Sequence, residues 1–180
     1  MKAQRGFTLV ELMITLAIVA LVLTLGVPTF QESFRNYRVT SLTNQFFTSL
    51  NLARSTAIKE NVRAVLLKFD TSVTPVPGTL PPAAGGFERG WIVFADPNNN
   101  ATWEAGETLI QVFEPVADTG VTIQGNNFVA NYISFSPDGT ARQTGGNPQN
   151  GTITVCKSPT ALNITISLHG RIRTGEPPPC

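Results

Sequence analysis

The chain has 180 residues, which suits one domain with an extension and is too short for two full domains. Hydrophobic residues make up 42% of the chain and charged residues 14%, a balance that permits a packed core and excludes long disorder. The 13 basic and 12 acidic residues leave a formal charge of +1. A global basic field that would hold nucleic acid is therefore excluded, and any such binding needs a local patch.

The N-terminus joins a short basic segment to a long apolar run. Lys2 and Arg5 precede the run, and Glu11 is its one charged residue. As a helix rising about 1.5 Å per residue, residues 7–27 would cover about 30 Å, the thickness of a hydrocarbon core. The preceding basic residues favour a cytoplasmic N-terminus. We predict that residues 7–27 span a membrane.

Three interpretations of this segment compete. A secretory signal peptide needs a shorter run and a small-residue cleavage site, and no convincing site occurs near residues 25–30. An ordinary membrane anchor fits the length but leaves Glu11 unexplained, because a carboxylate at that depth normally persists only with a partner or a function.

The third interpretation rests on residues 6–11, Gly-Phe-Thr-Leu-Val-Glu, which closely resemble the prepilin signature. The resemblance implies that residues 1–6 are a leader, that a prepilin peptidase cuts between Gly6 and Phe7, and that the new Phe7 amine is methylated. It also implies that Glu11 pairs with the Phe7 ammonium of a neighbouring subunit, so that a buried charge sets the assembly register.

The helix is predicted to continue to residue 60, with a bend near Pro28, which removes one helix hydrogen bond. Beyond the bend, apolar residues recur at steps of three and four and form one stripe. The stripe consists of Val39, Leu42, Phe46, Leu50, Ala53 and Ala57. We expect it to cover the core of a head formed by residues 61–180.

Short β-like runs separated by Gly, Pro and Asn follow residue 61. The predicted strands are Val62–Phe69, Trp91–Ala95, Thr108–Phe113, Tyr132–Phe135, Thr152–Cys156 and Leu162–Leu168. The first strand is predicted to be buried on both faces, whereas apolar and polar residues alternate along the last strand, as on a half-exposed sheet. The predicted fold class is α+β, with a long bent helix laid against an antiparallel sheet.

Cys156 and Cys180 are the only cysteines. Beside an export segment, such a pair predicts a disulfide formed in an oxidising compartment, and two unpaired thiols are the alternative. The disulfide would close a loop of 25 residues and contribute about 3 kcal/mol.

Three head segments resemble the GspH/FimT branch of type IV pilin-like proteins: residues 90–107, the run Tyr132–Gly139 and the C-terminal Gly-Arg-Ile-Arg. With the N-terminus, the resemblance spans most of the chain. The branch contains minor pilins of type IV pili and the minor pseudopilin of type II secretion. It implies a type IV pilin-like fold.

The segment Gly170–Arg173 is the main candidate site. In an extended chain, Arg171 and Arg173 project on one face about 6.6 Å apart, and each guanidinium can take a phosphate oxygen. Gly170 would let a backbone approach, Lys157 would add positive charge, and His169 would add positive charge below about pH 6.5. The resemblance to FimT-like minor pilins implies binding of double-stranded DNA. Two ordinary surface arginines are the alternative.

A second candidate lies in residues 96–107, where oxygen side chains match the spacing of a calcium loop. They are Asp96, Asn98, Asn100, Thr102, Glu104 and Glu107. Ala101 replaces the expected glycine, and a polar turn between strands explains the composition equally well.

No catalytic set, zinc-like spacing or phosphate loop is found, so neither an enzyme nor a cofactor is predicted. The predicted function is a minor pilin that binds DNA for uptake in natural transformation. A type II secretion pseudopilin and a priming minor pilin are the alternatives. The expected location is the inner membrane with a periplasmic head, and then the extracellular pilus, in contact with other pilin subunits through the helix.

Overall fold

The computed structural model describes residues 7–72, 74–78, 85–117, 120–175 and 180, except for the side chains of residues 25–29. The chain forms two compact units, Met1–Tyr37 and Arg38–Cys180. The leader predicted at residues 1–6 lies outside the described residues.

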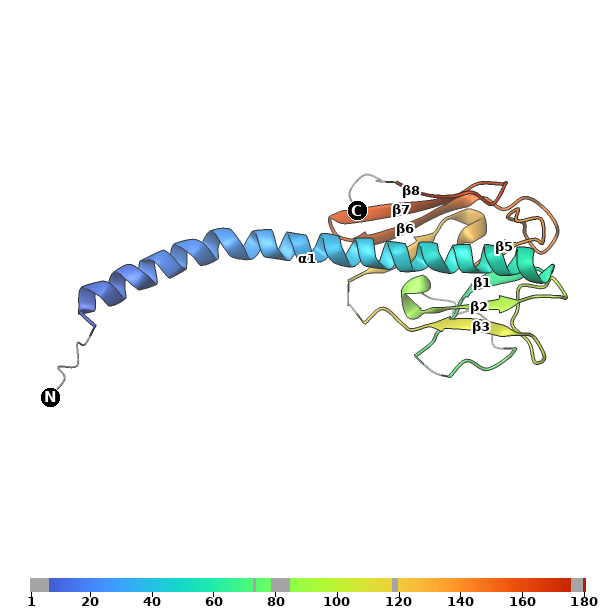
Figure 1. Ribbon diagram of the computed structural model, residues 1–180, viewed down its shortest axis with the longest axis horizontal. Coiled ribbons are helices and arrows are strands. Elements are labelled where there is room, and N and C mark those ends of the chain that lie inside the picture. The colour runs from blue at the N-terminus through green and yellow to red at the C-terminus, as the bar shows by residue number, and fades with distance from the viewer. Residues whose placement is uncertain (1–6, 73, 79–84, 118–119, 176–179) are drawn as a thin grey trace. The chain divides into compact units, whose positions relative to one another are not determined.

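One helix, α1 (Leu9–Glu60), runs through both units (Figure 1). It begins with a capping box, in which Thr8 Oγ1 accepts from the Glu11 N–H and the Glu11 carboxylate accepts from the Thr8 N–H. It ends at Glu60, and the next residue, Asn61, has a φ of 51°, the left-handed conformation that commonly stops a helix. The helix continues through Pro28, whose side chain lies outside the described part, so the bend there stays a prediction.

Within the described residues, no helical stretch is both long enough and apolar enough to qualify as a membrane span. The span predicted at residues 7–27 includes side chains that are not described, and it stays a prediction.

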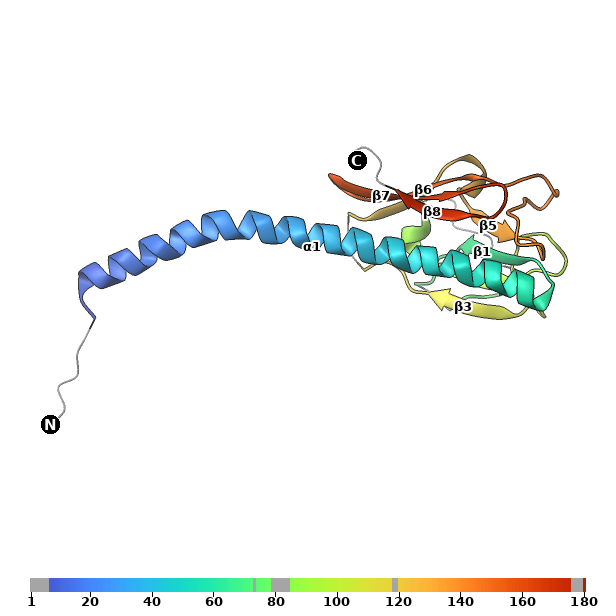
Figure 2. The same cartoon turned by 45° about the horizontal axis from the view of Figure 1, so that its top comes forward.

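The head contains two antiparallel four-stranded sheets. Sheet A has the order β3-β2-β1-β5 and sheet B the order β4-β6-β7-β8. Their strands are β1 (Ala64–Lys68), β2 (Trp91–Ala95), β3 (Leu109–Phe113), β4 (Thr122–Gly125), β5 (Tyr132–Phe135), β6 (Gly151–Lys157), β7 (Thr160–Ile166) and β8 (Ile172–Gly175). In Figures 1 and 2, β6, β7 and β8 lie on one side of the second half of α1. The predicted α+β class is confirmed.

The predicted strands Trp91–Ala95 and Tyr132–Phe135 match β2 and β5. The antiparallel head consists of two sheets, and β4 and β8 were not predicted as strands. Both are four residues long, and each contains a single apolar residue, so neither produces a run that alternation can detect. The strand predicted to reach Leu168 ends at Ile166, because the chain turns there.

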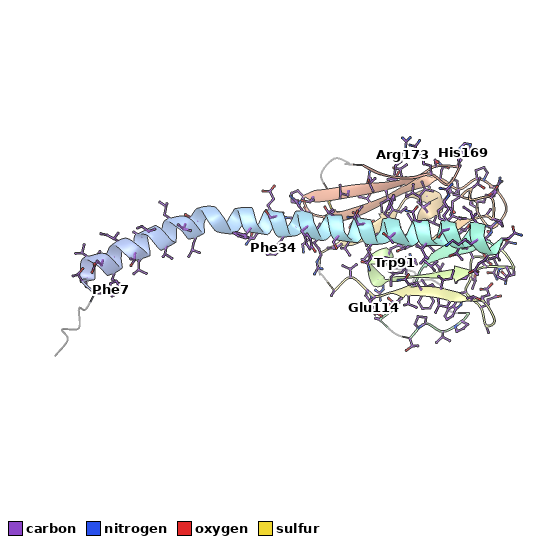
Figure 3. All side chains as sticks on the ribbon, in the orientation of Figure 1. Phe7, Phe34, Trp91, Glu114, His169 and Arg173 are labelled. Atoms are coloured by element: carbon purple, nitrogen blue, oxygen red, sulfur yellow. A yellow bond between two sulfur atoms is a disulfide. The ribbon has the colours of Figure 1, made fainter. Side chains whose placement is uncertain are left out.

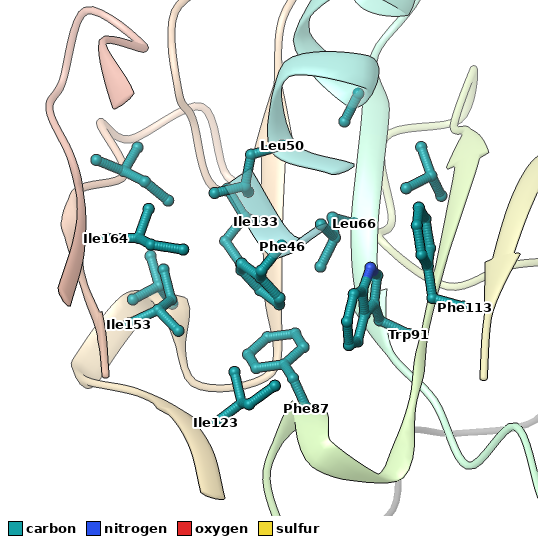
Figure 4. Packing of buried hydrophobic residues seen from close by; sticks show 14 of the residues in the cluster. Phe46, Leu50, Leu66, Phe87, Trp91, Phe113, Ile123, Ile133, Ile153 and Ile164 are labelled. Carbon is teal, nitrogen blue, oxygen red and sulfur yellow. The ribbon is translucent and has the colours of Figure 1, made fainter. Parts of the chain in front are cut away.

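The second half of α1 and both sheets share one core (Figure 4). All six residues of the predicted stripe are buried. Phe46 lies at the centre, with its ring centroid 5.0 Å from that of Phe87 and 5.1 Å from that of Trp91. The indole N–H of Trp91 donates to Ser49 Oγ at 3.0 Å, so the one polar atom of that ring is satisfied inside the core.

The two sheets differ in how many faces they bury. Sheet A contributes to a second apolar cluster, which includes Val65, Leu67 and Trp103, so β1 is buried on both faces as predicted. In sheet B, Ile153, Ile164 and the apolar residues two positions away from each along the strand point to the core. Because side chains alternate along a strand, the other face of sheet B points outward.

Candidate functional site

The candidate arginines lie on the hairpin formed by β7 and β8. The Ser167 N–H donates to the Arg171 carbonyl at 3.0 Å, and the Gly170 N–H donates to the Ser167 carbonyl at 2.9 Å. Gly170 has a φ of 70°, a conformation that glycine adopts without a steric penalty. A three-residue loop ending in such a glycine is a common hairpin connection.

The register of this hairpin sorts its side chains into two faces. Thr165 pairs with Arg173 and Ile166 with Ile172. Since Ile166 belongs to the core, Thr165 and Arg173 point to the outer face. An open groove of about 540 Å³ lies there, lined by Thr165, Ser167, His169, Arg171 and Arg173. Figure 3 shows Arg173 and His169 on this side of the head and Glu114 on the other.

The turn of the hairpin rests on another turn and on α1. A Cβ added at Gly170 would lie 2.0 Å from the carbonyl oxygen of Gly139. Arg54 of α1 donates from Nε to the same oxygen at 3.0 Å. The backbone that closely approaches Gly170 in the structure is therefore the protein's own, which gives this glycine a role in holding the hairpin.

Sheet B is free of acidic residues. None of its strands contains Asp or Glu, and residues 140–175 contain neither. The carboxylate of Asp138, just before this stretch, accepts from Thr140 and lies 3.8 Å from Arg142. Glu176, which follows β8, lies outside the described residues. The Thr140 hydroxyl, chiefly, lowers the pKa of Asp138. Within the described part of the chain, no carboxylate pairs with Arg171 or Arg173, so their charge is available to a ligand.

The structure brings together three of the predicted DNA-binding side chains and separates a fourth. His169, Arg171 and Arg173 share the groove. Lys157 pairs with Thr160, at the start of β7, whereas Arg173 pairs five residues further along that strand. At about 3.3 Å per residue, Lys157 stands well away from the groove.

Three residues of the site were not predicted. Thr165 and Ser167 line the groove, and Arg54 supports the turn. Alternation of polar with apolar residues along β7 marks Thr165 and Ser167 as outward-facing, which is the signal that could have found them. No pattern in the sequence places Arg54 beside Gly139, because 85 residues separate the two.

The disulfide predicted between Cys156 and Cys180 is present, with 6.2 Å between the two Cα atoms. It joins the middle sheet strand β6 to the C-terminus, and the enclosed loop contains β7, β8 and both groove arginines. The covalent link therefore restrains the chain at the far end of β8.

Three side chains of the possible calcium loop, those of Asp96, Asn98 and Asn100, accept hydrogen bonds from within the loop. Both carboxylate oxygens of buried Asp96 accept backbone N–H groups, those of Asn100 and Ala101. The side-chain oxygens of Asn98 and Asn100 also accept backbone N–H groups. Across the described residues, no three His, Cys, Asp or Glu side chains are grouped so that they could hold a metal. These contacts support the polar turn, the alternative interpretation of the segment.

Two other members of the predicted loop make different contacts. Glu104 accepts from the side-chain amide of Asn98 at 2.8 Å. Glu107 accepts the Glu104 N–H through Oε2, while its Oε1 is buried without a hydrogen-bond partner in the described part of the chain. Burial, above all, raises the pKa of Glu107, and the charges of Asp96 and Glu104 add to the rise.

At the N-terminus, Glu11 is engaged by Thr8 in the capping box, and Phe7 is exposed. Gly6 lies outside the described residues. The proposed pairing of Glu11 with the amine of another subunit stays a prediction.

The comparisons with known proteins agree with this architecture. A model of the prokaryotic N-terminal methylation motif matches residues 1–27, and a model of type II transport protein GspH matches residues 42–170. Crystal structures of the type IV minor pilin FimU of Pseudomonas aeruginosa in two crystal forms align with TM-scores of 0.59 and 0.56, both at 15% identity. They cover 80% and 78% of this chain and 96% and 98% of FimU.

Two fimbrial proteins of Pseudomonas aeruginosa are each 36% identical over 75 residues, which is 42% of this chain and 45% of each relative. The chain thus spans less than half the length of these curated relatives.

A methylation-type N-terminus on a helix whose second half packs against antiparallel sheets defines a type IV pilin-like protein. The chain belongs to the GspH family, whose model covers most of the head and the second half of α1.

Removing the disulfide should destabilise the head. Cys156→Ala with Cys180→Ala frees a segment with a sequence separation of 24, so urea unfolding should show a loss of about 3 kcal/mol. A reducing agent should lower the stability of the wild type and leave that of the variant unchanged. Equal stability of the two proteins without reductant would contradict this expectation.

The charge on Glu107 should destabilise the head at neutral pH. Its pKa is higher in the folded state than the ordinary value of 4.5, so stability falls as the pH rises through 4.5 and on to the folded value. Glu107→Gln should therefore raise Tm at neutral pH and not at about pH 3, whereas Glu114→Gln, at an exposed site, should change Tm little. A rise in wild-type Tm with calcium that the Glu107→Gln variant lacks would favour the metal interpretation instead.

Proposed function

We propose that this protein is a minor pilin of a type IV pilus and that it binds double-stranded DNA, without sequence specificity, for uptake in natural transformation. The observation that carries the proposal is the groove on the outer face of sheet B, where Arg171 and Arg173 lie together and the described lining residues include no Asp or Glu. The resemblance of the Gly-Arg-Ile-Arg segment to that of FimT-like minor pilins supports the same assignment.

The chemistry of the groove favours the DNA backbone over the bases. A guanidinium forms strong, charge-assisted hydrogen bonds to phosphate oxygens, and such contacts carry no sequence information. The described residues that line the groove include no Phe, Tyr or Trp, so no stacking platform for unpaired bases is provided. So few charges suit a weak, salt-sensitive complex, with a Kd on the order of 10⁻⁴–10⁻⁶ M.

We also propose a role for the N-terminus in assembly. Cleavage after Gly6 would expose the Phe7 amine for methylation, and Glu11 would neutralise that ammonium on a neighbouring subunit, a pairing that a carboxylate in lipid requires. While residues 7–27 span the inner membrane, the head would reside in the periplasm. In the assembled pilus, the head would become extracellular.

The second candidate function is a type II secretion pseudopilin, and the match to the GspH family model favours it. Such a subunit, like a priming minor pilin that only starts filament assembly, has no need for DNA affinity. DNA binding through the groove therefore separates the proposed function from both alternatives.

Replacing both groove arginines should abolish DNA binding. Arg171→Gln with Arg173→Gln removes the two guanidiniums that would contact phosphate, and a gel mobility shift with the full chain in detergent should lose the complex. Arg35→Gln with Arg38→Gln makes the same change in net charge on α1 and should leave the shift in place. Unchanged affinity of the groove variant would exclude these arginines from DNA binding.

A further inference from the structure

We propose that Thr165 and Ser167 are additional phosphate-binding residues, whose hydroxyl groups contact the DNA backbone beside Arg171 and Arg173. This inference rests on the proposed function and extends it from two charged residues to a four-residue surface. Hydroxyl side chains are common donors to phosphate oxygens in protein–DNA complexes.

The register of the hairpin places the hydroxyls next to the guanidiniums. Thr165 is the cross-strand partner of Arg173, and Ser167 bonds the backbone of Arg171 through its own N–H. Directly opposed residues on one face have Cβ atoms about 5 Å apart. All four side chains line the same groove, so a phosphate held by one guanidinium would also lie near a hydroxyl.

The hydrogen-bond partners leave both hydroxyl protons for a ligand. Ser167 Oγ accepts from the Arg171 N–H at 3.2 Å, a bond that uses a lone pair and leaves the O–H as a donor. Thr165 is exposed, and its hydroxyl makes no hydrogen bond to any residue that the structure describes. The hydroxyl of Thr154, on the adjacent strand of the same sheet, is instead bonded to Asn163.

A hydroxyl and a guanidinium can be told apart by the salt dependence of binding. Each cation that neutralises a phosphate releases counterions and adds about 0.9 to the slope of log K against log salt concentration. A neutral hydroxyl releases none. It should contribute to affinity at every salt concentration and leave the slope unchanged.

The test compares Thr165→Val with Thr122→Val in the full chain, by titrating a DNA duplex at several salt concentrations. Valine keeps the β-branched shape and removes the hydroxyl. Thr122 is exposed on β4 of the same sheet, outside the groove. We expect Thr165→Val to bind about three- to tenfold more weakly with the salt slope of the wild type. Thr122→Val should bind like the wild type. Arg173→Gln should bind more weakly and also show a shallower salt slope.

Thr165→Ser retains the hydroxyl and should bind like the wild type, which separates loss of the donor from any change in folding. Equal affinity of Thr165→Val and Thr122→Val, with binding still dependent on Arg173, would overturn this inference alone. No binding of DNA by the wild type would overturn the proposed function as well.

Discussion

The apolar stripe on the second half of α1 is the surface on which the rest of the head depends. Phe46 contacts Phe87 and Trp91 at its centre, and residues of both sheets join the same core. Burial of side chains of this size contributes about 1.5–3 kcal/mol each. Since this core takes one face of sheet B, the period of two along each strand leaves every second side chain outside, and the groove forms on that outer face.

The parts of the fold with a regular period could be predicted from the sequence. The apolar residues at steps of three and four in α1 identified its buried stripe. The alternation of apolar and polar residues in β7 identified a sheet with one solvent-exposed face. The strand β8 could not be predicted, because Ile172 is its one apolar residue and its pairing is set by the turn at Gly170. The grouping of Lys157 with the arginines failed for a related reason: closeness to Cys156 in the sequence does not reveal the position along a hairpin.

The distribution of charge gives the head two different sides. Residues 61–118 contain three basic and seven acidic residues, whereas residues 119–180 contain four basic and two. Asp70, Asp96, Glu104 and Glu107 lie in the connections between the strands of sheet A, where Asp70 pairs with Arg89. A polyanion would be repelled there and attracted to the outer face of sheet B, so the near-neutral net charge of the chain hides a directional field.

We propose that a polyanion contacts the outer face of the β7–β8 hairpin, and NMR spectroscopy of the labelled full chain in micelles tests this proposal most directly. On addition of a short DNA duplex, we expect chemical-shift changes concentrated in the amides of residues 165–175, with the amides of β2 and β3 unchanged. Shifts confined to the connections of sheet A, or none at DNA concentrations above the micromolar range, would contradict it.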